Sequence, residues 1–290
     1  MAEATIQDAI AAATEHLIAA GVAEARQDAW YLLCHATGKD RATLMAHHQE
    51  HLDPRSAAAF SACVERRCRR EPVAHILGTK EFWSLPFEIN ADVLSPRPDS
   101  EVLIETALGC LVESDDLKTA PLRLLDLGTG SGCLLLALLH ELPGAIGVGA
   151  DISNEALAVA RANGQRLGVD ARVHWVQAAW GTALDDTYDL IVSNPPYIER
   201  GDFAELLPEI RLFEPYQALV AGDDGLDAYR ALAPDIKRLL SEKGIACLEI
   251  GLGQAEAVSA LMAEVGLSSI ACRQDLAGIG RCLVVAHDQR

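Results

Sequence analysis

Strand-like and helix-like segments alternate from residue 122 to residue 286, and this alternation limits the fold more than any other feature of the chain. The strand-like segments are short, continuous apolar runs. Such runs are typical of strands buried on both faces, and strands separated by helices are typical of parallel sheets. The expected strands are 122–127, 145–150, 173–177, 188–193, 245–250, 268–273 and 280–286, with helices such as 154–168 and 226–240 between them. The sequence therefore predicts an α/β domain with a Rossmann-like, doubly wound, mostly parallel sheet.

A different pattern occupies the N-terminal part of the chain. Apolar residues at helical spacing predict a small bundle of four helices within residues 5–70. Aromatic and β-branched residues between turn residues then suggest a β-hairpin over 76–94, and a polar loop is expected at 114–121. We therefore predict a helical domain at 1–75, a β-hairpin linker at 76–98 and the α/β domain at 99–290.

The net charge of −18 is unevenly distributed, since residues 81–290 carry −17 of it. Proteins that grip duplex DNA usually present a basic face to the phosphates, so we expect no direct DNA partner. The eight cysteines include no C-x-x-C pair and are expected to be reduced, with no metal site. No apolar run is long enough to span a bilayer, and the N-terminal residues lack the pattern of a secretion signal. We expect a cytoplasmic protein without a membrane partner, and a monomer.

A glycine-rich stretch, Gly128-Thr129-Gly130-Ser131-Gly132, directly follows the expected strand 122–127. A glycine turn between a buried strand and a helix lets the backbone approach a ligand closely. A dinucleotide fingerprint would need its third glycine at 133, where this chain has Cys133. Asp151 ends the next expected strand, where a carboxylate can accept both hydroxyls of a ribose. The pattern predicts a nucleotide-like cofactor other than NAD; the alternative is a tight turn without a ligand.

The turn Asn194-Pro195-Pro196-Tyr197 follows the expected strand 188–193 and should face the same crevice, because ligands bind at the carboxyl ends of parallel strands. An amide or aryl amine is a poor nucleophile, since its lone pair is delocalised. The Asn194 side-chain oxygen and the Pro195 carbonyl can accept its two N–H groups, and Pro196 biases Pro195 to an extended conformation. Tyr197 can stack on the planar group. The two motifs together suggest methyl transfer from S-adenosylmethionine to an sp² nitrogen.

Other polar residues are interpreted as structural. The arginine cluster at 66–70 is expected to be a solvated helix end, although a contact for an acidic or RNA-bound partner is the alternative. Asp99 and Glu101 are expected to cap a helix. Cys133 lies at a helix start, which can lower a thiol pKa, but packing is the favoured role. Surface roles are expected for His47, His48 and His51.

The chain resembles the bacterial peptide chain release factor glutamine N5-methyltransferases, the HemK/PrmC family, over nearly its whole length. The stretches that carry the resemblance are 71–78, 94–101, 125–133, 151–153, 191–198, 224–230 and 248–251. The resemblance implies methylation of the glutamine in the Gly-Gly-Gln loop of release factors, with the N-terminal helices helping to dock the factor. It further implies that Gly128–Gly132, Asp151, Trp180 and Asn194 contact S-adenosylmethionine, and that Asn194–Tyr197 hold the glutamine.

Two departures from the family pattern are visible. The family usually has a polar residue directly before the position of Trp180, where it meets the adenine amino group, and this chain has Ala178-Ala179. Adenine recognition is then expected to rest on Trp180 and backbone groups. The usual I-P-R-P-E-T-E is represented by residues 95–101, which keep Pro96-Arg97-Pro98.

Three other functions stay open at the level of sequence. The same N-P-P-Y chemistry occurs in methyltransferases of adenine N6 or cytosine N4 in DNA, which need base flipping; the acidic α/β part disfavours that function. A related enzyme methylates a glutamine of a large-subunit ribosomal protein. A cofactor-binding module that docks on translation factors without turnover is the non-enzymatic alternative, and the intact turn at 194–197 argues against it.

Overall fold

The computed structural model describes residues 5–113 and 121–288 and divides into two compact units. The first unit holds the residues up to 79 together with the separate segment 206–213, and the second holds 80–205 and the residues from 214 onward. Most of the polar loop expected at 114–121 lies outside the described residues. The three-part division at 75 and 98 stays a prediction.

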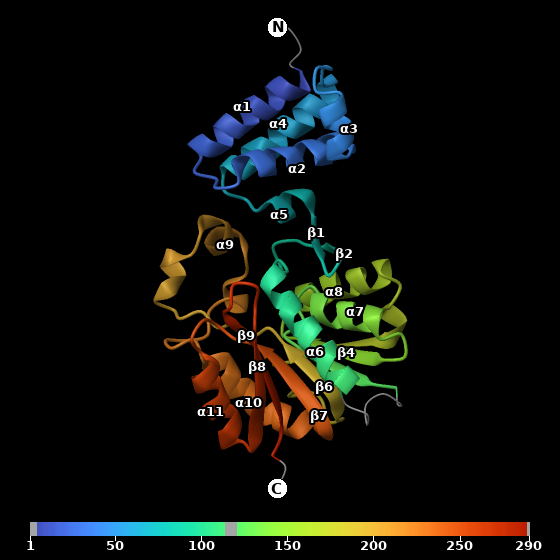
Figure 1. Ribbon diagram of the computed structural model, residues 1–290, viewed down its shortest axis with the longest axis vertical. Coiled ribbons are helices and arrows are strands. Elements are labelled where there is room, and N and C mark those ends of the chain that lie inside the picture. The colour runs from blue at the N-terminus through green and yellow to red at the C-terminus, as the bar shows by residue number, and fades with distance from the viewer. Residues whose placement is uncertain (1–4, 114–120, 289–290) are drawn as a thin grey trace. The chain divides into compact units, whose positions relative to one another are not determined.

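The first unit is helical, as expected (Figure 1). Apolar faces of its helices form one core that includes Leu17, Leu32, Leu33 and Phe60. Its helices are α1 (Ile6–Ala19), α2 (Ala25–Thr37), α3 (Arg41–Ala46), α4 (Pro54–Cys68), α5 (Val73–Leu77) and α9 (Pro208–Phe213). The short helices α5 and α9 were not predicted, because five or six residues carry little periodicity. Helix α3 is equally short, but it lies within the bundle predicted at 5–70.

The arginines of the 66–70 cluster are mostly not solvated, so that prediction is wrong. Arg67 is buried, and its guanidinium donates to Asp28 at 2.7 Å and to Glu209 at 2.9 Å. Arg70 makes two hydrogen bonds of 2.7 Å to Glu209. Only Arg69 of the cluster is exposed. The acidic partners lie about 40 and 140 residues away in the sequence, so local patterns gave no signal for them.

We expect Arg67→Ala to lower the free energy of unfolding by about 3–5 kcal/mol, because removing one partner of a buried ion pair leaves the other charges uncompensated. The measurement is chemical denaturation followed by circular dichroism. The matched control is Arg69→Ala, which removes an exposed arginine and should stay within about 0.5 kcal/mol of the wild type. Equal effects of the two substitutions would show that the buried cluster does not stabilise this unit.

The second unit is built on a seven-stranded sheet in the order β5-β4-β3-β6-β7-β9-β8. Its strands are β3 (Arg123–Leu127), β4 (Ile146–Asp151), β5 (Val173–Gln177), β6 (Tyr188–Ser193), β7 (Leu240–Glu249), β8 (Leu267–Gln274) and β9 (Gly280–His287). The pairs from β5 to β7 are parallel, whereas β9 is antiparallel to both β7 and β8. The predicted Rossmann-like, mostly parallel sheet is confirmed.

The expected hairpin is formed by β1 (Thr79–Phe82) and β2 (Leu85–Glu88), which pair with each other. The 3₁₀ turn Pro98–Ser100 then leads into α6 (Glu101–Glu113). The predicted capping role of Asp99 and Glu101 at the start of α6 stays a prediction. No side chain caps the 3₁₀ turn, and Glu101 accepts the backbone N–H of Trp83 at 2.9 Å.

Two groups of helices cover the two faces of the sheet (Figure 1). The first group is α6, α7 (Cys133–Glu141) and α8 (Asn154–Arg166), and the second is α10 (Asp227–Leu239) and α11 (Ala255–Glu264). Successive residues of β3 separate the two cores, since Leu124 belongs to the first and Leu125 to the second. Burial on both faces explains why the strands read as continuous apolar runs.

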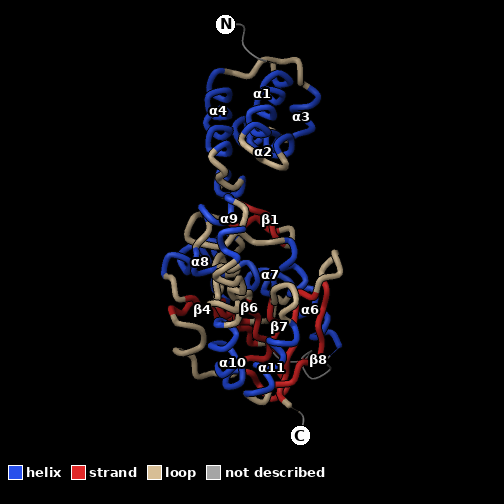
Figure 2. Tube along the Cα trace, turned by 90° about the vertical axis from the view of Figure 1, so that its left-hand side faces the viewer, coloured by secondary structure: helices blue, strands red, loops and turns tan. Residues whose placement is uncertain are grey.

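Figure 2 follows the chain through both units and marks its helices, strands and loops. Within residues 5–113 and 121–288, none of the helices reaches the length and apolarity needed to cross a membrane.

Candidate active site at the carboxyl ends of the strands

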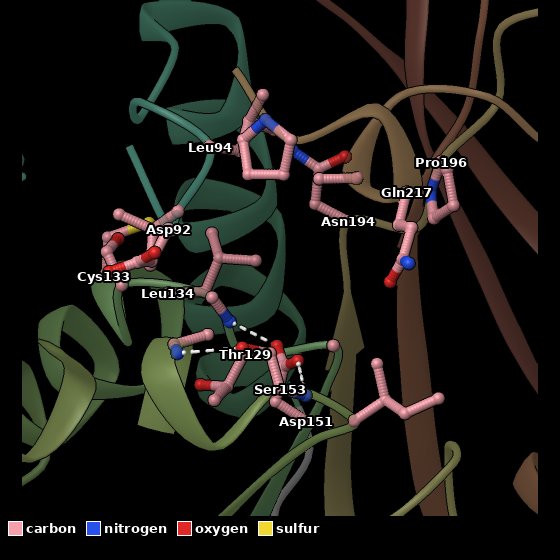
Figure 3. A pocket seen from close by; sticks show the side chains of 18 of the residues that line it. Asp92, Leu94, Thr129, Cys133, Leu134, Asp151, Ser153, Asn194, Pro196 and Gln217 are labelled. Carbon is pink, nitrogen blue, oxygen red and sulfur yellow. Dashed lines mark hydrogen bonds between the residues drawn. The ribbon is translucent and has the colours of Figure 1, made fainter. Parts of the chain in front are cut away.

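A cavity of about 510 Å³ opens in the second unit beyond the carboxyl ends of β3, β4 and β6 (Figure 3). This volume lies within the range of small-molecule sites. The predicted site residues that line it are Gly128, Thr129, Gly130, Ser131, Asp151, Trp180, Asn194 and Pro196. In Figure 3, Asn194, Pro196 and Gln217 lie on one side and Thr129, Asp151 and Ser153 on the other. The structure therefore brings both sequence motifs to one cavity.

The loop after β3 approaches the cavity with its backbone. The N–H groups of Gly128 and Thr129 both donate to the carbonyl of Ala150 at 2.9 Å, which ties the loop to the end of β4. Gly128 has φ of +77°, and a side-chain carbon at this position would lie 3.2 Å from the Trp180 ring. Glycine is needed here both for the left-handed conformation and for the close approach of the indole.

Trp180 itself has a left-handed conformation, with φ of +55°. Such a conformation is costly for a bulky residue and is concentrated at functional sites. Trp180 lines the cavity together with Ala178 and Ala179, the small residues that depart from the family pattern.

Gly132 does not line the cavity and has a packing role. A side-chain carbon at this position would lie 3.0 Å from Leu136 and 3.2 Å from Ala160. Gly132 precedes the first residue of α7 and lets this helix approach α8. Gly128 and Gly132 therefore have different roles, which the spacing of the glycines alone did not reveal.

Asp151 is held by two backbone donors. One carboxylate oxygen accepts from the N–H of Gly130 at 2.9 Å, and the other accepts from the N–H of Ser153 at 2.9 Å (Figure 3). Each carboxylate oxygen has a further lone pair, so Asp151 can also accept hydrogen bonds from a ligand in the cavity.

Buried Asp126 lies in β3, two residues before Gly128, and accepts a hydrogen bond from the Thr129 hydroxyl at 2.7 Å. Burial is the main cause that raises the pKa of Asp126 to about 7, and the nearby charge of Asp151 adds to it. The glycine loop is thus fastened from both sides by carboxylates at the ends of β3 and β4.

Asn194 directly follows the last residue of β6, and the nitrogen of its side-chain amide is hydrogen-bonded. Its Nδ2 donates to the Ser100 hydroxyl at 3.2 Å, and that hydroxyl donates to the Glu249 carboxylate at 2.5 Å. Ser100 and Glu249 are each 2% exposed. Both residues lie in stretches that carry the family resemblance, 94–101 and 248–251, but sequence reasoning did not assign them to the site, because they lie about 94 and 55 residues from the turn.

Tyr197 and Pro195 do not line the cavity. The Tyr197 ring packs against the core under α10 and α11, and its hydroxyl donates to Glu249 at 3.3 Å. Burial and the charge of Glu249 raise the pKa of Tyr197, so the hydroxyl keeps its proton. The stacking role of Tyr197 stays a prediction.

Two further segments line the cavity. Residues 91–97 contribute one wall, and Pro215, Gln217 and Ala218 contribute another. Arg97 donates to Glu214 at 2.6 Å, which joins the two segments. The Pro-Arg-Pro run gave a signal for the first segment, whereas the sequence around Gln217 contains no recognisable motif.

The remaining candidates have structural roles. His47, His48 and His51 are exposed, as expected. Within the described residues, no group of three or more His, Cys, Asp or Glu side chains is arranged to hold a metal ion. Cys133 packs against the core between the sheet and α6–α8, which matches its expected role, and it also lines the cavity (Figure 3).

Comparison with known protein families identifies two domains. Residues 8–78 match the PrmC N-terminal domain, and residues 106–211 match the methyltransferase small domain. Among curated proteins, a release factor glutamine methyltransferase of Cereibacter sphaeroides is 44% identical over 94% of this chain and 95% of its own length. One of Rhodospirillum rubrum is 43% identical over 91% of this chain and 80% of its own length.

Solved structures share the fold at low sequence identity. The catalytic domain of human Mettl16, solved with an RNA hairpin, has a TM-score of 0.58 at 16% identity and covers 81% of this chain and 82% of its own. A methyltransferase of Pyrococcus furiosus has a TM-score of 0.54 at 16% identity, with coverages of 76% and 97%. These likenesses support the methyltransferase fold.

We expect the Cys133 thiol to react slowly with iodoacetamide at neutral pH, because burial raises its pKa to about 12 and the thiolate is the reactive form. The alkylation rate, followed by mass spectrometry, should keep rising with pH up to pH 10 without a plateau. Cys272, which is exposed, serves as the control and should react first. Rapid alkylation of Cys133 at pH 7 would show instead that the helix start lowers its pKa.

Proposed function

We infer the reaction of this protein from its family: the chain belongs to the release factor glutamine methyltransferases. It is an enzyme that transfers a methyl group from S-adenosylmethionine to a side-chain amide nitrogen of a release factor glutamine. The observation that carries this conclusion is the identity above 40% over more than nine tenths of the chain, which includes both units.

We further propose that the substrate is the glutamine of the Gly-Gly-Gln motif in class I release factors, and that the methyl group is added to N5. The helical unit, which matches the PrmC N-terminal domain, would dock the factor. We also propose that the enzyme works as a monomer in the cytoplasm, where release factors act.

The cavity suits S-adenosylmethionine in size and chemistry. The backbone of Gly128–Ser131 would lie against the cofactor, Asp151 would accept its ribose hydroxyls, and the Trp180 ring would face the adenine. The left-handed conformation of Trp180 supports such a role. Bound S-adenosylmethionine supplies a methyl group on a positively charged sulfur.

The turn after β6 would hold the substrate. Asn194 and Pro196 line the cavity, and the Asn194 oxygen and the Pro195 carbonyl would accept the two N–H groups of the glutamine amide. These acceptors orient the nitrogen toward the cofactor and favour a localised lone pair, so catalysis rests on proximity and preorganised dipoles. As the bond between this nitrogen and the methyl carbon forms, the bond between that carbon and the cofactor sulfur would break, and the nitrogen would lose one proton to water.

The proposal is tested with labelled S-adenosylmethionine and a purified release factor, followed by mass spectrometry of the Gly-Gly-Gln peptide. We expect the label on that glutamine and none on a factor in which the glutamine is replaced by alanine. Large-subunit ribosomal proteins and DNA are incubated in parallel. Labelling of one of these in place of the release factor would overturn the proposal.

In the same assay, Asn194→Ala should lower kcat by roughly 10²–10³, the effect of losing one preorganised polar contact in the transition state. Binding of S-adenosylmethionine, measured by calorimetry, should change much less. Unchanged turnover would contradict the proposed role of Asn194.

Asp151→Ala should weaken binding of S-adenosylmethionine by about tenfold or more, because a hydrogen bond to a charged group contributes about 1.5–3 kcal/mol. Calorimetry measures this change directly. The matched control is Asp185→Ala, which removes the same charge from an exposed residue that does not line the cavity. Equal cofactor affinity in the two variants would rule out contact between Asp151 and the ribose.

A further inference from the structure

Glu249 is a buried carboxylate that the reaction described above does not use. It is the last residue of β7 and is 2% exposed. Ser193 of β6 pairs with Leu248 of β7, so the next residues on the two strands, Asn194 and Glu249, lie beside each other at the edge of the sheet. A buried carboxylate costs free energy unless it is hydrogen-bonded. Its place beside the substrate-holding turn suggests a role there.

Two hydroxyl groups from different elements converge on this carboxylate. One oxygen accepts from Ser100 at 2.5 Å, and the other accepts from Tyr197 at 3.3 Å. Burial, the largest cause, raises the pKa of Glu249, whereas its hydrogen bonds to Ser100 and Tyr197 and the nearby Arg281 guanidinium lower it. The Ser100 hydroxyl carries a single hydrogen, and in its 2.5 Å hydrogen bond with Glu249 this hydroxyl is the donor. The hydrogen of the Ser100 hydroxyl is therefore committed to Glu249.

Because the Ser100 hydrogen is donated to Glu249, only one end of the Asn194 amide can face Ser100. With its hydrogen given to Glu249, the Ser100 oxygen can only accept. Only the NH₂ group of Asn194 can donate to it, and the two atoms lie 3.2 Å apart. The carbonyl end of the Asn194 amide then points away from Ser100. Asn194 lines the cavity, so its acceptor is left for a ligand.

We propose that Ser100 and Glu249 are positioning residues that fix the Asn194 amide with its oxygen available to the substrate nitrogen. The inference rests on the proposed function, because it concerns how the same turn holds a glutamine amide. A substrate amide presents N–H donors, and a reversed Asn194 would oppose them with donors of its own. The chain Glu249–Ser100–Asn194 thus selects a group that donates hydrogen bonds at the reacting position.

The test compares four variants in the release factor assay: Ser100→Ala, Ser100→Thr, Asn194→Ala and the double variant Ser100→Ala/Asn194→Ala. Ser100→Ala frees the amide to rotate and should lower kcat by about tenfold, with less than threefold change in KM for the release factor and in cofactor affinity. Ser100→Thr keeps the hydroxyl and should recover kcat to within about threefold of the wild type.

The double variant separates positioning from a general structural role. If Ser100 acts through Asn194, the double variant should be no slower than Asn194→Ala alone, because coupled residues are non-additive. Multiplied effects of the two substitutions, or wild-type kcat in Ser100→Ala, would overturn the inference. Thermal unfolding of each variant with bound S-adenosylmethionine confirms that it is folded.

A variant of Glu249 tests the same series of hydrogen bonds at its other end. Glu249→Gln replaces the carboxyl group that accepts from Ser100 with an amide whose NH₂ end can donate to Ser100 instead. This substitution removes the reason for a single orientation of Asn194. We expect a loss of kcat that also disappears in the Asn194→Ala background, and an independent loss would contradict the inference. Failure of the proposed function is distinguishable, since the wild-type protein itself would then leave the release factor unmethylated.

Discussion

The parallel pairing of β6 between β3 and β7 is the constraint on which the site depends. Because the strands run in the same direction, their carboxyl ends meet at one edge of the sheet. The buried Ser193 hydroxyl donates to the carbonyl of Leu127 at 2.6 Å and fastens the last residue of β6 to the last residue of β3. A change in the register of β6 would move the turn at 194 away from the glycine loop. It would also move Asn194 away from Glu249.

The helices on the two faces make this alignment rigid. Leu124 and Leu125 lie in separate cores, so a strand displaced by one residue would exchange the residues that face α6–α8 with those that face α10 and α11. The helices also contact the strand ends directly, since the Tyr229 hydroxyl of α10 donates to the carbonyl of Glu249 at 2.8 Å. Polar residues at this edge then need hydrogen-bond partners from neighbouring loops, which Asp126, Asp151 and Glu249 each find.

The sequence predicted the sheet and both motifs because their signals are local. Continuous apolar runs marked the strands, and β5 and β6 begin and end where they were expected. The carboxyl-end rule then placed the glycine loop and the turn at one cavity. Two kinds of feature stayed out of reach. Short helices such as α9 lack periodicity, and pairings such as Arg67 with Glu209 join residues far apart in the chain.

The same limit applies within the site. The spacing of the glycines did not distinguish Gly128, which lies at the cavity, from Gly132, which allows helix packing. Tyr197 has an aromatic ring that can stack on a planar group, but this ring packs against the core. The relation of Ser100 and Glu249 to the site is visible only in the folded chain, where the turn before α6 and the end of β7 lie beside Asn194. A motif therefore indicates which residues gather, whereas the direction of each side chain depends on neighbours that the motif does not contain.

The fold by itself does not determine the substrate. A structure solved with a 3′UTR hairpin shares this fold at 16% identity. In the mechanism that we propose, the acceptor side chain at the end of β6 orients the substrate nitrogen. Choice among substrates must then come from surfaces outside the turn. The helical unit is the part of this chain that matches the PrmC N-terminal domain, and residues 206–213, which follow the turn in sequence, belong to that unit. The chain leaves the second unit after the turn, contributes residues 206–213 to the first unit, and returns to the second unit at Glu214, before Val220 forms a β-bridge with Ile198. The turn is thus linked along the chain to the unit that we propose to dock the release factor.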